Sequence, residues 1–229
     1  MAAALPNFDP IARAYRWLEY LSFGPMLAHC RFSSLPELVH SRRALVFGDG
    51  DGRFLARLLT LNPHLTADVV DSSAEMLRLL EQRICSIGAE ARERITLHHA
   101  GALSFAPPKF GYDLVVTHFF LDCFSTEQLA ALFRMLRPHL SAGALWALSD
   151  FAIPPGPIAA VCGRLLVAGL YRSFGLLTGL RTRTLPEYRG LFEDNGFTLC
   201  QRKTWLRGLL AGEVWRLTEP PPGRGITLI

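Results

Sequence analysis

The stretch ALVFGDGDGRFLARLL, residues 44–59, places glycines at alternate positions between an apolar run and an amphipathic run. The apolar run is short and ends at a glycine, which is typical of a buried strand. The run after it repeats apolar residues at helical intervals. A glycine-rich turn between a first strand and its helix lets a ligand approach the backbone at the carboxyl edge of an α/β sheet. The stretch therefore predicts such a sheet, with a ligand site at that edge.

The chain up to residue 151 continues this alternation of strands and helices. Alternating strands and helices at this spacing favour a parallel, doubly wound sheet. Two late strands, 197–206 and 213–218, are expected to form a hairpin. The remaining expected strands are 43–48, a strand ending at Asp71, 95–100, 112–120 and 143–151. The expected helices are 52–61, 73–84 and 125–140, and residues 8–32 also show helical periodicity.

The composition excludes several classes of protein. Half of the 229 residues are hydrophobic and 19% are charged, so the chain can form a packed core. The net charge is +4, but the arginines are scattered, which argues against a nucleic-acid partner. The five cysteines show no zinc-binding spacing, so no metal is expected. The N-terminus lacks the pattern of a signal peptide, and we expect a cytoplasmic protein with reduced thiols.

The spacing of the glycine loop indicates what it binds. A dinucleotide site needs a third glycine where this chain has Arg53. Asp49 and Asp51 would also repel a pyrophosphate. A ligand with a sugar, an amino group or a sulfonium tolerates both acids, and S-adenosylmethionine has all three and no phosphate. Asp71, at the end of the second strand, is placed to accept hydrogen bonds from ribose hydroxyls, although it is also a candidate cap of the next helix.

At this point the sequence resembles the class I S-adenosylmethionine-dependent methyltransferases. The resemblance covers about residues 40–150 and rests on the order and spacing of GDGDG, VVDSSAEML, FGYDLVVTHFFLDCF and LRPHLSAGALWALSDF. The N-terminal stretch FDPIARAYRWLEYLSFG is similar to the ubiquinone/menaquinone C-methyltransferase group. The resemblance departs from the family pattern at Val46 and Gly101, where the family usually has acids.

The resemblance implies a set of cofactor-binding residues. Gly48, Gly50 and Gly52 would lie under the methionine and ribose, and Asp71 would hold the ribose. Asp49 or Asp51 could replace the acid that is missing at position 46, and a backbone carbonyl at Gly101 could replace the other. The remaining expected cofactor contacts are Ser72 and Met76 beside the adenine, Gly101 and Ala102 at its edge, and Thr117 near the methyl group.

Methyl transfer requires alignment, exclusion of water and, for some acceptors, a base. His118, at the end of the fourth strand, is the candidate base because its pKa class suits proton transfer near neutrality. Asp122 is the candidate carboxylate. A structural role remains open for each, as a wall residue for His118 and as a cap for Asp122 or Asp150. The residues expected to bind the acceptor are Tyr15, Phe119, Asp150 and Tyr171.

We expect one domain over residues 1–229, on a Rossmann-like, mostly parallel seven-stranded sheet with a C-terminal antiparallel hairpin and a helical cover over the active site. Its expected parts are an N-terminal cover (1–40), a cofactor-binding core (41–150), a helical lid (151–190) and terminal strands (191–218). The apolar segment 158–180 could instead contact a membrane. The expected function is S-adenosylmethionine-dependent methylation of a small apolar or aromatic acceptor. The alternatives are an inactive binding or regulatory protein and a peripheral membrane enzyme acting on a quinone or lipid.

Overall fold

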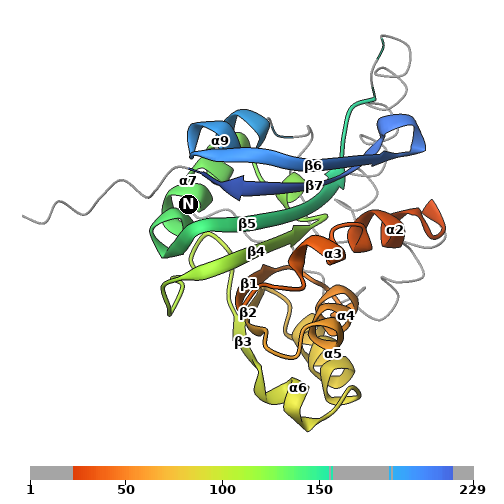
Figure 1. The fold of residues 1–229 in the computed structure, drawn as a ribbon, viewed down its shortest axis with the longest axis vertical. Coiled ribbons are helices and arrows are strands. Elements are labelled where there is room, and N and C mark those ends of the chain that lie inside the picture. The colour runs from red at the N-terminus through yellow and green to blue at the C-terminus, as the bar shows by residue number, and fades with distance from the viewer. Residues whose placement is uncertain (1–22, 155, 157–185, 187, 219–229) are drawn as a thin grey trace, which may run out of the picture.

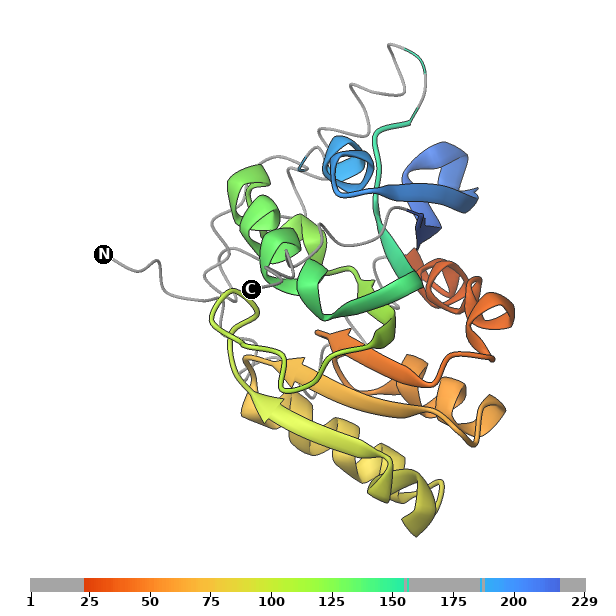
Figure 2. The same ribbon diagram turned by 60° about the vertical axis from the view of Figure 1, so that its left-hand side comes forward.

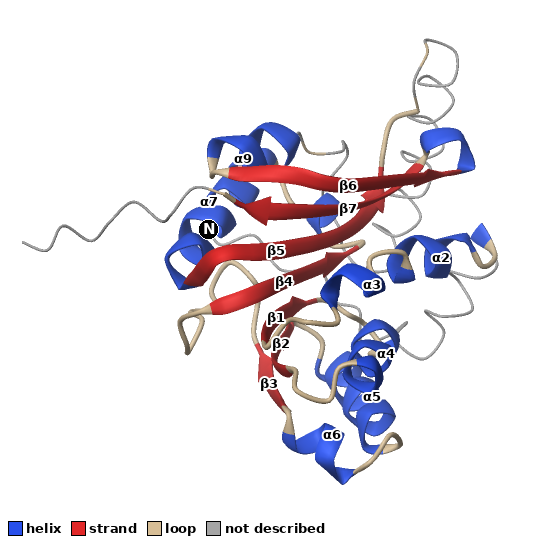
Figure 3. Cartoon of the chain, viewed as in Figure 1, coloured by secondary structure: helices blue, strands red, loops and turns tan. Residues whose placement is uncertain are grey.

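A computed structural model describes residues 23–154, 156, 186 and 188–218. Its strands form one seven-stranded sheet in the order β3-β2-β1-β4-β5-β7-β6. Figure 1 shows the strands running side by side, and Figure 3 shows them as one continuous twisted layer. The strands are β1 (Arg43–Phe47), β2 (Thr66–Asp71), β3 (Ile95–His99), β4 (Tyr112–His118), β5 (Leu140–Phe151), β6 (Phe197–Trp205) and β7 (Leu210–Leu217).

The pairing of the strands confirms the predicted sheet. Strands β1 to β5 pair in parallel, whereas β7 pairs antiparallel with both β5 and β6. Strand β1 lies between β2 and β4, with Val46 opposite Val69 on one side and Val116 on the other. These strands are apolar along most of their length because helices cover both faces of a parallel sheet.

Two hydrophobic clusters divide the core between the two faces of the sheet. One cluster joins β1 and β2 to α4 (Arg53–Leu61) and α5 (Ala74–Cys85), through residues such as Phe54 and Leu80. The other joins β4, β5 and β7 to α7 (Thr126–Leu136) and α9 (Tyr188–Asp194), with stacked aromatic rings around Trp146. Figure 2 shows α2 and α7 on opposite sides of the sheet. The short elements are α3 (Leu35–Leu38), α6 (Ala89–Glu93), η2 (Leu121–Cys123), η3 (Arg137–His139) and η4 (Leu206–Gly208).

Helix α2 (Met26–Phe32) lies at the edge of the sheet where β1, β4 and β5 end. It contacts β5, β6 and β7, and its buried residues are Leu27, Cys30 and Arg31. The carbonyl oxygen of Cys30 lies 3.2 Å from where a Cβ at Gly212 of β7 would be, so the helix approaches the strand closely. This packing brings the end of the expected N-terminal cover to the carboxyl edge, where a doubly wound sheet binds its ligands.

The rest of the expected cover lies outside the described residues. This applies to residues 1–22 and to the lid segment 158–180, including Tyr15 and Tyr171. Within the described residues, no helix has the length and apolar character needed to cross a bilayer. The same residues contain no group of three or more His, Cys, Asp or Glu side chains arranged to hold a metal ion.

Candidate active site

A cavity lies at the carboxyl edge of the sheet, over the ends of β1, β2 and β4. Its walls come from the glycine loop after β1, the turns after β2 and β3, the segment after β4, and helix α2. The lining residues are Arg31, Gly48, Asp49, Gly50, Asp51, Arg53, Val70, Asp71, Ser72, Met76, Ala100, Gly101, Ala102, His118, Phe119, Phe120, Cys123 and Phe124. Most of the residues expected to bind a cofactor therefore lie together around one cavity.

The glycines of the loop serve two different purposes. A Cβ at Gly52 would lie 2.7 Å from Cγ of Leu80, so this glycine allows α4 and α5 to pack together, and it does not line the cavity. A Cβ at Gly48 would lie 2.5 Å from the ring of Phe120. Gly50 has a φ of +60° and faces open space, with no described atom within 4 Å of a Cβ placed there. The open space above Gly50 is where a ligand can reach the backbone.

The two aspartates of the loop do not make it strongly negative. Asp51 is paired with Arg53 and Arg83, each at 2.8 Å from one of its carboxylate oxygens. Asp49 accepts a hydrogen bond through Oδ2 from the backbone N–H of Leu55, in the first turn of α4, at 3.0 Å. Burial raises the pKa of Asp49 to about 7, although this bond and the charge of Arg31 oppose the change. The ion pairs and the raised pKa thus explain how a ligand site tolerates two acids.

The end of β2 holds the acid that was expected to bind ribose. Asp71 lines the cavity, and its Oδ1 accepts a hydrogen bond from the N–H of Ser73 at 2.8 Å. The N-cap of α5 is Ser73, whose hydroxyl accepts from the N–H of Met76, so Asp71 is not the residue that caps the helix. The carbonyl of Gly101 accepts bonds from the N–H and hydroxyl of Ser104, both at 3.0 Å.

His118 lines the cavity where β4 ends, and β1 lies between β4 and the strand that ends at Asp71. Its Nδ1 is 3.1 Å from the hydroxyl of Ser149, and this hydroxyl donates to the carbonyl of Cys30 at 3.2 Å. A hydroxyl has one proton, so Ser149 accepts from His118, and Nδ1 carries the proton of the neutral imidazole. The other nitrogen, Nε2, is buried and has no hydrogen-bond partner among the described residues.

The electrostatic surroundings keep the His118 imidazole uncharged. Burial, together with the positive charge of Arg31, holds the pKa of His118 well below its ordinary value of 6.5. The ring also packs edge-on against Phe54, with 4.2 Å between the ring centroids. A neutral imidazole with a protonated Nδ1 presents a basic lone pair at Nε2.

The segment after β4 forms an aromatic wall. Phe119 has a φ of +52°, a conformation that is strained for a bulky residue and is found preferentially at functional sites. The guanidinium of Arg31 lies 5.5 Å from the centroid of the Phe119 ring. Phe120 stacks on Phe47 at 5.8 Å and contacts Phe124 at 5.0 Å.

Besides Gly52, three expected site residues in the described part of the chain do not line the cavity. Thr117 is fully buried and accepts a hydrogen bond from the indole of Trp146 at 2.9 Å. Asp150 is also fully buried and accepts bonds from the N–H groups of Asp122 (3.2 Å) and Phe151 (2.9 Å). Burial, with the nearby charge of Asp122, raises the pKa of Asp150 well above its ordinary value. Asp122 is buried beside it, in the 3₁₀ turn η2.

Cys123 lines the cavity and contacts this carboxyl pair. Its thiol donates to Oδ1 of Asp122 at 3.6 Å. Burial, reinforced by the negative charges of Asp122 and Asp150, raises its pKa well above 9.0, so the thiol stays protonated. It is therefore unsuited to act as a nucleophile.

Several cavity residues were not predicted from the sequence. Arg31 reaches the cavity because α2 packs on the sheet, which no local pattern of the sequence indicates. Phe120 and Phe124 follow the fourth strand, where only Phe119 was singled out. Arg53, Val70 and Ala100 line the cavity as neighbours of predicted residues.

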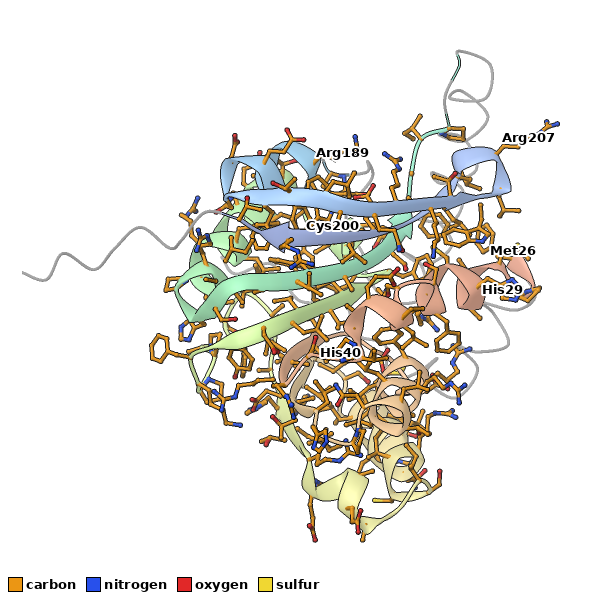
Figure 4. All side chains as sticks on the ribbon, in the orientation of Figure 1. Met26, His29, His40, Arg189, Cys200 and Arg207 are labelled. Carbon is orange, nitrogen blue, oxygen red and sulfur yellow. The ribbon has the colours of Figure 1, made fainter. Side chains whose placement is uncertain are left out.

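An apolar cluster borders the cavity on the side of Phe119. Leu27, Cys30 and Leu210 are buried in it, and Phe23, Met26, Phe119, Phe151 and Trp205 are partly buried against them. The rings of Phe119 and Phe151 are 5.8 Å apart, and those of Phe23 and Phe151 are 5.4 Å apart. Figure 4 shows Met26 on α2 and Arg207 at the β6–β7 turn on the same side of the molecule.

Comparisons with known proteins agree with this architecture. Residues 45–146 match the profile of a family described as "Methyltransferase domain". No curated protein sequence matches the chain significantly.

Solved structures with the same fold include several methyltransferases. The S-adenosylmethionine-dependent methyltransferase SibL is 18% identical, with a TM-score of 0.67 over 96% of this chain and 64% of its own. The mitomycin 7-O-methyltransferase MmcR is 14% identical, with a TM-score of 0.66 over 92% of this chain and 60% of its own. The chain thus spans less than two thirds of either protein.

The N-methyltransferase NodS from Bradyrhizobium japonicum, solved with S-adenosyl-L-homocysteine, is 16% identical. Its TM-score is 0.56 over 85% of each chain. At these identities the likeness concerns the fold. The described part of the chain has the α/β fold of the S-adenosylmethionine-dependent methyltransferases, and its residues 45–146 match a methyltransferase domain.

Proposed function

We propose that this protein transfers a methyl group from S-adenosylmethionine to a small aromatic or apolar acceptor that carries an O–H or N–H group. The observation that carries the proposal is His118, whose Nδ1 is tied to Ser149 and whose buried Nε2 has no partner among the described residues. A buried lone pair at the wall of a ligand cavity suits a general base.

The residues of the cavity fit the cofactor. Asp71 supplies a carboxylate at the end of β2 for a ribose diol, and the space above Gly50 admits a ligand to the backbone. Met76 and Ala102 both line the cavity and offer apolar surface for the adenine ring of the cofactor. Bound in this cavity, S-adenosylmethionine supplies an electrophilic methyl group on a sulfonium sulfur. The fit does not require the acids that the family usually has where this chain has Val46 and Gly101.

The proposed role of His118 is to remove a proton from the acceptor. Because its pKa is held well below 6.5, the imidazole is neutral at physiological pH and ready to accept. Ser149 keeps the proton on Nδ1 and thereby directs the lone pair of Nε2 to the acceptor. Burial and the charge of Arg31 both disfavour a second proton on the ring, so the imidazole returns to its neutral form after each transfer.

The proposed acceptor side is the apolar cluster around Phe119. Aromatic rings that are partly buried bind flat apolar molecules and exclude water from the site. Neighbours with this fold that are named as O- and N-methyltransferases support an O–H or N–H acceptor. The resemblance of the N-terminal stretch to C-methyltransferases of quinones stays a prediction, because residues 1–22 lie outside the described part.

The test is methyl transfer to a panel of small phenols and aromatic amines. Turnover is measured as the formation of S-adenosylhomocysteine. We expect turnover by the natural protein, and for His118→Asn we expect a kcat lower by roughly 10²- to 10⁴-fold with little change in cofactor affinity. His139→Asn is a matched control, since His139 stacks on Phe110 just before β5 begins. An undiminished kcat in His118→Asn would show that His118 is not the general base. Tight cofactor binding without turnover on any acceptor would favour the inactive binding protein.

A further inference from the structure

Arg31 brings a buried positive charge into the cavity, close to the candidate base. Its side chain extends from α2, is 5% exposed and lines the cavity together with His118. The preceding residue, Cys30, accepts through its carbonyl from the hydroxyl of Ser149, which is bonded to Nδ1 of His118. A cation in this position weakens the base, because it opposes protonation of the imidazole.

The same guanidinium contacts the aromatic wall of the cavity. It lies 5.5 Å from the centroid of the Phe119 ring. Phe119 has a φ of +52°, and its N–H donates to the carbonyl of Ser149 at 2.6 Å. Phe119 also belongs to the apolar cluster that is the proposed acceptor side. Arg31 is therefore close to both the candidate base and the proposed place of the acceptor.

His118 alone is a weak base for an O–H acceptor. Burial and the charge of Arg31 hold its pKa well below 6.5, whereas the pKa of a phenol is about 10. Moving a proton from such a phenol to this imidazole is unfavourable by more than about 10³-fold. A positive charge within about 4–6 Å of the acceptor oxygen lowers the pKa of the hydroxyl by about 1–3. The charge that weakens the base can thus also make the acceptor more acidic.

We propose that Arg31 stabilises the acceptor as an oxyanion, so that the protein methylates acidic hydroxyl groups, such as those of phenols, in preference to amines. The proposal rests on the proposed function. The acceptor O–H gives its proton to Nε2 of His118, and the oxygen forms a bond to the methyl carbon. The carbon–sulfur bond breaks, and its electron pair stays on sulfur. A guanidinium beside the oxygen is a charge-assisted donor that stabilises the negative charge formed when the proton leaves.

An amine acceptor would meet the opposite effect. Methyl transfer to a neutral nitrogen leaves a positive charge on that nitrogen until its proton departs, and Arg31 would repel this charge. Arg31 therefore favours one class of acceptor and disfavours the other. An action through the basicity of His118, or a purely structural contact with Phe119, would instead change both classes in the same direction.

The charge of Arg31 acts on three titratable groups of the protein, which are Asp49, His118 and Cys30. Burial raises the pKa of Cys30 to about 12, so the thiol is neutral. Burial also raises the pKa of Asp49 to about 7, so this carboxyl is mostly protonated at pH 6. His118 is neutral at the same pH. The effect of Arg31 on a bound acceptor is therefore best measured near pH 6.

The first test is spectroscopic and needs no turnover. The compound 4-nitrophenol changes its absorption when it ionises, and at pH 6 it is mostly neutral in free solution. Bound to the natural protein with S-adenosylhomocysteine, whose sulfur is uncharged, it should be largely ionised, with a pKa lowered by about 1–3. In Arg31→Gln it should stay neutral, whereas Arg31→Lys keeps the charge and should retain most of the effect. Arg57→Gln is the matched control, because Arg57 is exposed on α4 and does not line the cavity.

The second test compares kcat/KM for 4-methylphenol and 4-methylaniline, which differ in the acceptor atom. The natural protein should prefer the phenol. Arg31→Gln should lose roughly 10²- to 10³-fold on the phenol and be at least as active as the natural protein on the amine.

The proposal is overturned if 4-nitrophenol stays neutral on the natural protein, or if a folded Arg31→Gln loses activity equally on both acceptors. Should Arg31→Gln fail to fold, the ionisation of 4-nitrophenol on the natural protein and on Arg31→Lys decides. A natural protein that methylates both compounds at similar rates contradicts this proposal alone. A natural protein that methylates no acceptor contradicts the proposed function, and this proposal with it.

Discussion

The imidazole of His118 donates through Nδ1 to the hydroxyl of Ser149, 3.1 Å away, and that hydroxyl donates in turn to the carbonyl of Cys30 on α2. A chain of two hydrogen bonds thus connects the N-terminal helix to the candidate base and selects its tautomer. Burial keeps the ring neutral, and the charge of Arg31, on the same helix, adds to this effect. Helix α2 therefore contributes to both the protonation state and the orientation of His118.

Ser149→Ala removes the acceptor that holds the proton on Nδ1. We expect kcat to fall about 2- to 10-fold, because one net hydrogen bond contributes about 0.5–1.5 kcal/mol. Steady-state kinetics at saturating cofactor and acceptor measure the change. Ser141→Ala is the control. Ser141 lies near the start of β5, and its hydroxyl also donates to a backbone carbonyl, that of Tyr112. An unchanged kcat in Ser149→Ala would contradict tautomer control by Ser149.

Asp71→Ala should weaken the binding of S-adenosylhomocysteine by roughly 10- to 100-fold, since each charged hydrogen bond to the ribose contributes about 1.5–3 kcal/mol. Its comparison is Ser73→Ala, which removes the N-cap of α5 and should cost about 1 kcal/mol of stability. Affinity measured by calorimetry and stability measured by urea unfolding separate the two roles. Asp71 has no part in ribose binding if its variant loses only stability.

The same substitution, glycine to alanine, should have different effects on stability and on cofactor binding at two positions of the glycine loop. Gly52→Ala meets Leu80 at 2.7 Å and has a φ of +77°, so we expect a loss of roughly 1–2 kcal/mol from the backbone and 1–3 kcal/mol from overpacking. Gly50→Ala faces open space and should cost the backbone part alone, but it should weaken cofactor binding. Thermal melts and calorimetric titrations of both variants measure the difference. Equal loss of stability in the two would contradict the packing role assigned to Gly52.

The protonation of Asp49 also affects stability. The folded pKa of about 7 lies above the ordinary 3.8, so the folded state holds a proton that the unfolded state releases between these values. The stability that this group contributes is fully present below pH 4, declines as the pH rises, and is lost above pH 7. The total decline in the free energy of unfolding is at most about 4 kcal/mol. Asp49→Asn should remove this decline. Urea unfolding of both proteins at pH 5 and pH 8 measures it, and an equal decline in the two would refute the raised pKa.

Much of the fold could be predicted because its pattern is local. The strand around Val46 is short, apolar and followed by glycines, and each later strand has a similar outline. The parallel sheet then follows from the alternation of strands with helices, and the late antiparallel pair follows from two strands that are close together in the sequence. The ends of β1, β2 and β4 locate the cavity, which is why Asp71 and His118 were predicted there from their places in the strands, whereas Met76 was predicted from the family resemblance.

The remaining site residues depend on packing that no local pattern contains. Arg31 enters the cavity because α2 crosses to the end of β4, about 90 residues later in the chain. Asp122 and Asp150 were predicted from their places just after or at the end of a strand, but both side chains are buried. Asp122 lies within η2, and Asp150 accepts from the backbone N–H groups of Asp122 and Phe151. Thr117 turns to Trp146 because alternate residues of a strand face opposite sides of the sheet.

The central claim is that the cavity above the glycine loop binds S-adenosylmethionine. Isothermal titration calorimetry with S-adenosylhomocysteine tests it most directly, on the natural protein and on Gly50→Val, with a thermal melt to show that both are folded. We predict that the natural protein binds one ligand per chain and that Gly50→Val binds none, because its side chain fills the open space. A folded natural protein that gives no binding, or a Gly50→Val variant that binds with unchanged affinity, would contradict the claim.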